Sequence, residues 1–175
     1  MTRNIQSHGK KLIHVTLCLM ILIFLAPQTV YATDNPIQPA QNFTLKSHSG
    51  KNIKLSELRG QVVMLNFWAS WCGTCIQQLP ILNKLHQNHA KEGFTVLAIN
   101  IDESTRKAIS IAKKQKLKFP VLFDTFNHVS RYYSVSSIPV SILIDRDGNI
   151  RHSLSATKIS QQKKTTQLIE ELLNE

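Results

Sequence analysis

The stretch VVMLNFWASWCGTC, residues 62–75, decides the fold of this chain. Its first seven residues form a nearly continuous apolar run, typical of a strand buried on both faces of a sheet. Cys72 and Cys75 follow where this strand ends and a helix begins. The first thiol then lies over the unpaired amides of the first helical turn, whose partial positive charge favours a thiolate, and the second lies one turn further on. This arrangement suits disulfide exchange, although the spacing alone also fits a static disulfide, half of a zinc site or two buried thiols.

The size and the cysteine count favour a chemical use for this pair. The chain has 175 residues, enough for one domain with a core of its own, and three cysteines. Cys18 falls in the N-terminal segment, so the remaining chain holds a single pair. Cysteines this close together close a very small loop, which removes little entropy from the unfolded chain. The pair is therefore expected to react rather than to stabilise.

The first 32 residues have the pattern of an export signal. A basic start that includes Arg3 precedes an apolar run over 17–26, Pro27 breaks it, and Ala32 ends a short stretch suited to cleavage. We predict cleavage after Ala32, with an uncleaved membrane anchor over 12–32 as the alternative. Either outcome places the domain outside the cytoplasm and facing the periplasm. Disulfides persist there, and a dithiol needs a dedicated electron donor or acceptor.

The charge of the chain does not indicate a nucleic-acid-binding protein. The formal net charge is +10, and the chain stays basic without the predicted signal peptide. However, its lysines are scattered and no aromatic-rich basic motif occurs. A solvated basic surface, close to anionic lipid, is the better expectation.

The remaining pattern predicts an α/β domain over residues 42–175. Alternation of strands and helices after residue 61 indicates right-handed crossovers within a parallel or mixed sheet. Asp147-Gly148 between two apolar runs predicts a hairpin. The expected elements are a linker over 33–41, a hairpin of 43–46 with 52–55, a helical turn over 56–60, strands over 61–68, 94–101, 120–123, 140–144 and from 150, and helices after Cys75, over 102–116 and from Ser160.

The motifs together resemble a known family. Asn66–Cys75, Pro80 five residues later, Ile138-Pro139 and the stretch 144–148 are similar to the thioredoxin superfamily, and best to its exported TlpA/ResA-like branch. The resemblance runs from about residue 42 to the C-terminus. It implies the thioredoxin fold, a mixed central sheet flanked by helices, with an N-terminal hairpin extension.

The resemblance also implies roles for single residues. Cys72 matches the exposed nucleophile and Cys75 the buried resolving thiol, and the two form the redox disulfide. Pro139 matches a proline with a cis peptide bond, the isomer that proline adopts most readily. Beside it the backbone of Ile138 is expected to pair with an extended substrate strand, and Trp71 to contact the substrate. No cofactor and no metal are implied.

Two positions depart from the family pattern. Asn66 stands where thioredoxins have a buried aspartate, and Gln78 where many TlpA/ResA-like proteins have a glutamate. Either acid can take the proton of the resolving thiol. Because Cys75 must become a thiolate to attack the mixed disulfide, we expect water, the substrate or a partner to accept this proton, and exchange to slow below neutral pH.

The resemblance favours a monomeric enzyme that reduces protein disulfides. Its electrons would come from a transmembrane thiol donor, and apocytochrome c is one plausible substrate, as in cytochrome c biogenesis. The alternatives are a dithiol oxidase, because the reduction potential sets the direction, and a thioredoxin-fold copper chaperone that would use His128 as a third ligand.

Zinc binding is the main alternative from another class. His86 and His89 follow the cysteines in an order that superficially resembles a zinc finger. On one helix, however, the step from Cys75 to His86 spans roughly 16 Å, too far for ligands of one ion. We therefore expect both histidines on the solvent face of the helix.

Overall fold

The computed structural model describes residues 38–155 and 162–175, which lie in one compact unit, residues 36–175. The predicted signal peptide, most of the predicted linker and Ser160 lie outside the described residues. Among the described helices, none combines the length and apolar character needed to cross a bilayer.

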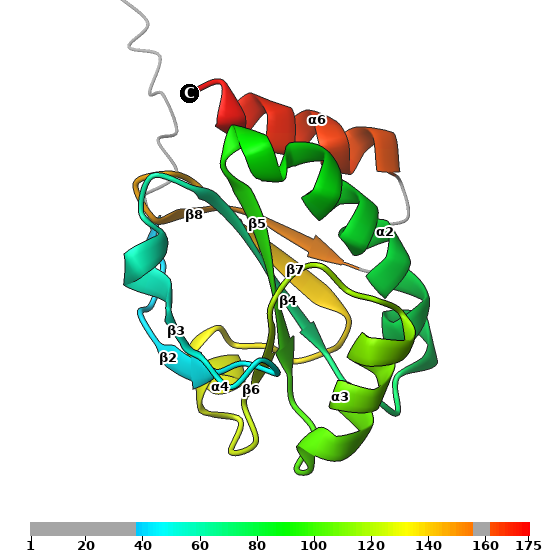
Figure 1. Cartoon of the computed structure of the whole chain (residues 1–175). Helices are drawn as coiled ribbons and strands as arrows, with labels where there is room; N and C mark the ends of the chain where they lie inside the picture. The colour runs from blue at the N-terminus through cyan, green and yellow to red at the C-terminus, as the bar shows by residue number, and fades with distance from the viewer. Residues whose placement is uncertain (1–37, 156–161) are drawn as a thin grey trace, which may run out of the picture. The chain divides into compact units, whose positions relative to one another are not determined.

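A six-stranded mixed sheet forms the centre of the domain, in the order β1-β8-β7-β4-β5-β6 (Figure 1). The strands β4, β5 and β6 run parallel, whereas β7 is antiparallel to β4, and β8 to β7. The sheet strands are β1 (Gln38–Pro39), β4 (Val62–Trp68), β5 (Phe94–Asn100), β6 (Val121–Phe123), β7 (Val140–Ile144) and β8 (Asn149–Ser155). The helices are α2 (Gly73–His89), α3 (Thr105–Lys114), α4 (His128–Tyr132) and α6 (Gln162–Leu173), with short 3-10 turns η1 (Leu55–Leu58) and η2 (Ala90–Glu92).

Two hydrophobic cores cover the two faces of this sheet. Every residue of β4 is buried, and because side chains alternate along a strand, Met64 and Trp68 belong to one core and Leu65 and Phe67 to the other. The first core packs under α2, α3 and α6, and the second under α4 and a separate hairpin (Figure 1). The apolar runs thus form central strands, and the predicted α/β fold is confirmed.

The predicted N-terminal hairpin is confirmed, with β2 (Thr44–Lys46) antiparallel to β3 (Asn52–Lys54). It also covers the outer edge of β6. The N–H of His48 donates to the Val121 carbonyl oxygen at 2.8 Å, and the Val121 N–H donates to His48 Nδ1 at 3.1 Å. The hairpin therefore satisfies both backbone groups of Val121 on that edge.

The expected linker is wrong at its C-terminal end, because Gln38 and Pro39 form β1 instead. They pair with Ile150 and Asn149 of β8, and the Ala40 N–H donates to the Gly148 carbonyl oxygen at 2.9 Å. Proline is tolerated here since β1 is an edge strand. A strand of two residues is too short to show a periodic pattern, so it could not be predicted.

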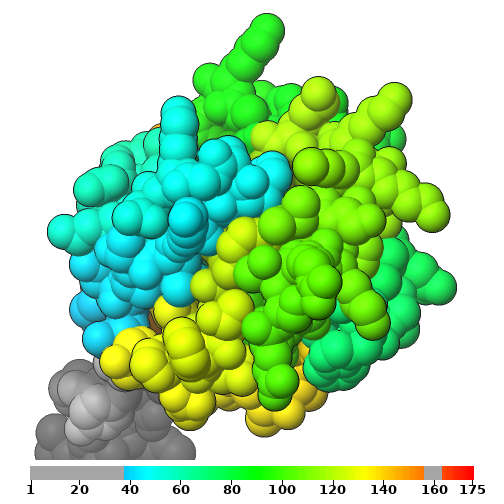
Figure 2. All heavy atoms as spheres, turned by 60° about the horizontal axis from the view of Figure 1, so that its bottom comes forward, coloured from blue at the N-terminus to red at the C-terminus, as the bar shows by residue number. Residues whose placement is uncertain are grey.

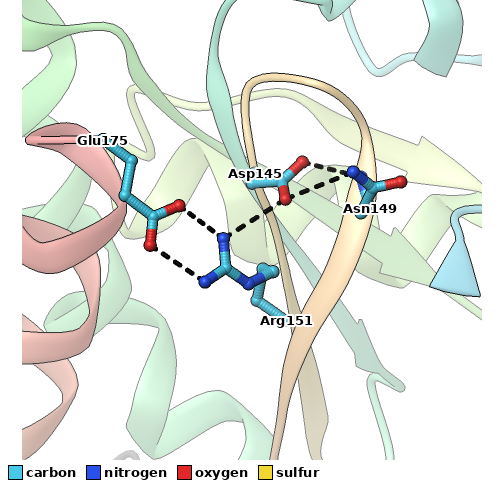
Figure 3. A network of polar contacts seen from close by, with 4 residues as sticks. All are labelled: Asp145, Asn149, Arg151 and Glu175. Carbon is cyan, nitrogen blue, oxygen red and sulfur yellow. Dashed lines mark hydrogen bonds and ion pairs between the residues drawn. The ribbon is translucent and has the colours of Figure 1, made fainter. Parts of the chain in front are cut away.

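Two arginines fasten the end of the sheet at the β7–β8 turn. Arg146 donates to the carbonyl oxygens of Gly60 at 2.7 Å, Glu92 at 3.2 Å and Leu173 at 3.0 Å. Figure 3 shows Arg151 between two carboxylates: its Nη2 donates to Glu175 at 2.9 Å, and its Nη1 contacts both Glu175 and Asp145. These contacts connect the C-terminal end of α6 to the sheet.

Candidate active site

The two cysteines lie at the start of α2, joined by a disulfide with a Cα–Cα distance of 5.2 Å. Cys72 has extended backbone dihedrals and is the N-cap residue, and its Sγ accepts the N–H of Cys75 at 3.2 Å. A sulfur in this position replaces the carboxylate or hydroxyl oxygen that usually accepts a free amide of the first turn. The same contact would stabilise a Cys72 thiolate after reduction, because the amide dipoles of the first turn point toward it.

The two cysteine residues differ in exposure to solvent. Cys72 retains 8% of its surface exposed and Cys75 only 1%, and both belong to the core cluster under α2. Trp71, immediately before them, is 72% exposed. An incoming group therefore meets Trp71 and Cys72 before Cys75.

Ile138 and Pro139 lie at the same end of the sheet. Their peptide bond is cis, which confirms the prediction for this bond. Since Val140 pairs with Phe67 in the antiparallel β4–β7 ladder, the two residues stand beside the end of β4, from which the cysteine loop continues. Ile138 also packs against the core cluster that contains both cysteines. All five predicted site residues are thus gathered at one end of the domain.

A buried carboxylate holds the loop before the cysteines, and the sequence interpretation missed it. The Ser70 N–H donates to both carboxylate oxygens of Asp102, at 3.0 and 3.2 Å, and Asn100 Nδ2 donates to Oδ2 at 3.2 Å. Asp102 is buried at the carboxyl end of β5. Ligand-binding and active sites commonly lie at this edge of open α/β sheets. The polar residues that follow the apolar run 94–99 could therefore have indicated Asp102 as a site residue.

Asn66 and Gln78, the two departures from the family pattern, are both buried. Asn66 donates through Nδ2 to Ser141 Oγ at 2.9 Å, across the β4–β7 pair. Gln78 is buried on α2, one turn after Cys75. Both buried positions are thus occupied by neutral amides.

The expectation that His86 and His89 face solvent is wrong. His89 is buried, its ring edge-on to Phe94 and its Nδ1 3.0 Å from Glu92, and His86 is half-buried and edge-on to Phe119. Burial lowers the pKa of His86, against a smaller opposing effect of a backbone hydrogen bond at Lys118. His89 is therefore a core residue, and His86 is partly covered against Phe119.

No three His, Cys, Asp or Glu side chains within residues 38–155 and 162–175 are grouped closely enough to hold a metal ion. His128, the ligand that a copper chaperone would use, is exposed at the start of α4 and lies against Phe126. This part of the chain thus has a cysteine pair at a helix start that stabilises a thiolate, and these are the features that disulfide exchange requires.

Comparison with known proteins agrees with this geometry. The family model described as AhpC/TSA matches residues 36–153. A thiol-disulfide oxidoreductase ResA of Bacillus cereus is 34% identical over 123 residues, which cover 70% of this chain and 71% of that protein. A crystal structure from Chlorobium tepidum, described as a candidate thiol:disulfide interchange protein DsbE, aligns with a TM-score of 0.69 at 34% identity, covering 76% of this chain and 96% of that one.

A solution structure from Bacteroides thetaiotaomicron, described as a candidate protein disulfide isomerase, aligns with a TM-score of 0.72 at 32% identity, covering 79% and 89% of the two chains. The names of all three similar proteins refer to disulfide chemistry, and this chain has its own Cys72–Cys75 disulfide at a helix start. The chain therefore belongs to the AhpC/TSA family, with the thioredoxin fold, and is a thiol-disulfide oxidoreductase similar to ResA.

Proposed function

We propose that Cys72 is the nucleophile and Cys75 the resolving thiol of this enzyme. One observation supports both roles. Of the two cysteines, Cys72 is the more exposed residue, and its sulfur accepts the Cys75 N–H at the helix start. Attack needs a reachable thiolate, and resolution needs a thiol that only the neighbouring sulfur can reach.

The reaction proceeds by two exchanges. The Cys72 thiolate attacks one sulfur of a substrate disulfide, the substrate S–S bond breaks, and one substrate thiolate leaves. The Cys75 thiolate then attacks Cys72 Sγ, the mixed disulfide breaks, and the second substrate thiolate leaves. The substrate gains two electrons, and the enzyme is left with the Cys72–Cys75 disulfide that the structure contains.

The substrate would dock beside this pair as an extended strand. Trp71 offers an exposed aromatic surface, and Ile138 and Pro139 stand at the start of β7, next to the loop that carries the cysteines. Main-chain pairing at Ile138 would bind many sequences, because it uses groups that every substrate has.

The proposed setting is outside the cytoplasm, with residues 1–32 as the export signal or anchor and residues 42–175 as the catalytic domain. The enzyme would face the periplasm and reduce protein disulfides, apocytochrome c among them, with electrons from a transmembrane thiol donor. The similarity to a thiol-disulfide oxidoreductase supports disulfide exchange, and the direction of reduction is part of the proposal. A reduction potential of the pair near or below about −250 mV is expected for a reductase, whereas about −120 mV would make the protein an oxidase.

Trapping experiments test the two roles. Cys75→Ser removes the resolving thiol, so the mixed disulfide with a substrate protein should accumulate and be visible on non-reducing gels. Cys72→Ser is the matched control, since it keeps one thiol but removes the proposed nucleophile, and it should trap nothing. The reverse pattern would overturn the assignment, and a pair that never closes in the purified domain would overturn the redox function itself.

A further inference from the structure

A proline inside α2 leaves one backbone carbonyl next to the cysteines without its regular helical donor. In an α-helix the N–H of residue 80 would donate to the carbonyl oxygen of Ile76, but Pro80 has no N–H. Ile76 directly follows Cys75, and its own N–H donates to the Cys72 carbonyl oxygen at 3.1 Å. The carbonyl that loses its donor therefore belongs to the helical turn that carries both cysteines.

A side chain from outside α2 supplies a donor to this carbonyl. Gln115, the C-cap residue of α3, donates through Nε2 to the Ile76 carbonyl oxygen at 3.3 Å. The two residues are 39 positions apart in the chain, so the contact joins the end of α3 to the start of α2. Figure 2 shows the green segment that includes α3 beside the teal-green start of α2. The Gln115 amide thus takes the place of the N–H that proline lacks.

The backbone at Gln115 is fixed by the way in which α3 ends. The Lys116 N–H donates to the Lys113 carbonyl oxygen at 3.1 Å. The Leu117 N–H donates to the Ala112 carbonyl oxygen, also at 3.1 Å, and the two bonds together form a Schellman motif. Lys116 has a φ of +52°, the left-handed conformation that this motif requires. The Gln115 side chain therefore starts from a well-defined position.

A second contact from the same segment holds α2 on the other side of Pro80. The Lys118 N–H donates to Asn83 Oδ1 at 2.8 Å. Residues 115–118 thus bind α2 at Ile76, before the proline, and at Asn83, after it. A proline tends to bend a helix, because its ring clashes with the carbonyl that it leaves free. The two contacts fix the two halves of α2, but only the contact at Ile76 acts on the turn with the cysteines.

The contact at Ile76 matters most when the disulfide is open. In the oxidised enzyme the Cys72–Cys75 bond itself closes the first turn of α2. After reduction this turn depends on hydrogen bonds alone. The Cys75 N–H, which donates to Cys72 Sγ at 3.2 Å, must then stay in place to stabilise the thiolate. A contact that fixes Ile76 therefore stabilises the reduced enzyme more than the oxidised enzyme.

We propose that Gln115 is a positioning residue for disulfide exchange: it replaces the hydrogen bond that Pro80 removes and keeps the first turn of α2 formed in the reduced enzyme. This inference rests on the proposed roles of Cys72 and Cys75. Gln115 acts through the Ile76 carbonyl rather than on the sulfurs. Its loss should therefore change the equilibrium between dithiol and disulfide, which a contact that stabilises both forms equally would leave unchanged.

The test equilibrates the purified protein with glutathione or dithiothreitol redox buffers and measures free and paired cysteines by alkylation and mass spectrometry. Gln115→Met keeps the length of the side chain but removes the donor, so the equilibrium constant for reduction of the pair should fall about tenfold. This corresponds to a reduction potential about 30 mV more negative. Gln115→Ala repeats the measurement without the bulk of the methionine side chain and should shift the equilibrium in the same direction.

The decisive comparison repeats Gln115→Met in a Pro80→Ala background. Pro80→Ala restores an N–H that can donate to Ile76, so Gln115→Met should then shift the equilibrium less than about twofold. Asn83→Ala is the matched control, because it removes the contact on the far side of the proline. It should lower the urea midpoint of unfolding at most, and leave the equilibrium between dithiol and disulfide unchanged.

The outcomes separate this proposal from the proposed function. If the wild-type cysteines never pair in the redox buffers, the proposed function fails. If they pair, but Gln115→Met leaves the equilibrium unchanged or shifts it equally in both backgrounds, the positioning role fails while the function stands. An equal shift by Asn83→Ala would also overturn the positioning role, because it would assign the effect to the stability of α2 as a whole.

Discussion

Replacing Asp102 should both destabilise the domain and slow disulfide exchange. Its carboxylate accepts two contacts from the Ser70 N–H and one from Asn100 Nδ2, at 3.0 to 3.2 Å. Ser70 is two residues before Cys72, so the carboxylate fixes the loop from which the nucleophile enters α2. Alanine at position 102 removes every one of these acceptor contacts at once.

The size of the effect follows from the donors that are left behind. Each buried donor without a partner costs about 1–3 kcal/mol, so Asp102→Ala should lower the free energy of unfolding by about 2–4 kcal/mol. Asp102→Asn keeps an oxygen for Ser70 but turns an NH₂ group toward the Asn100 amide, and should cost about 1–2 kcal/mol. A small displacement of a reacting group lowers the reaction rate strongly, so the rate of disulfide exchange by the alanine variant should fall about tenfold.

Urea denaturation of the oxidised proteins measures the first effect, and single-turnover reduction of a peptide disulfide measures the second. Glu103→Ala is the stability control, because it removes the adjacent but exposed carboxylate and should change the unfolding free energy by less than about 0.5 kcal/mol. The reasoning is refuted if Asp102→Ala is as stable as the wild type and exchanges at the same rate.

Two further predictions concern a turn and a histidine. Gly148 has a φ of +85°, and an added Cβ would lie 1.9 Å from Arg59 Cζ. Gly148→Ala should therefore lower the free energy of unfolding by about 1–2 kcal/mol through backbone strain, and further through the displacement of Arg59. Gly50→Ala is the control for strain alone, because Gly50 has a φ of +89° and open space around it; equal urea midpoints for the two variants would exclude any effect of Arg59. Burial lowers the pKa of His86 below 6.5, so the folded state binds a proton at this ring more weakly than the unfolded state does. The contribution of neutral His86 to the free energy of unfolding is therefore complete above pH 6.5 and is lost as the pH falls below 6.5. His86→Gln should flatten the fall in unfolding free energy between pH 7 and pH 5, and parallel curves for the two proteins would contradict this.

The parts of the fold that could be predicted are the elements whose own residues show a recognisable local pattern. The apolar runs that became β4 and β5 are long enough to identify buried strands, and Asp147-Gly148 identifies the β7–β8 hairpin. The five-residue α4 and the two-residue β1 are too short to show a period, and β1 exists only through its pairing with β8. Elements of this size depend on their tertiary partners.

The site was predictable where its residues are adjacent in sequence, and not where they meet through the fold. The cysteine motif identified α2 and the disulfide, whereas Asp102 reaches Ser70 across 32 residues and has no motif of its own. His89 could have been placed correctly, because it stands seven residues after Leu82 on the same buried stripe of α2.

The hairpin over β6 has a consequence for aggregation. An edge strand with free backbone groups is a template on which another extended chain can assemble. An enzyme whose proposed substrates dock as extended strands would meet such segments at every turnover. Since His48 occupies both edge groups of Val121, these chains find no template at that position of β6.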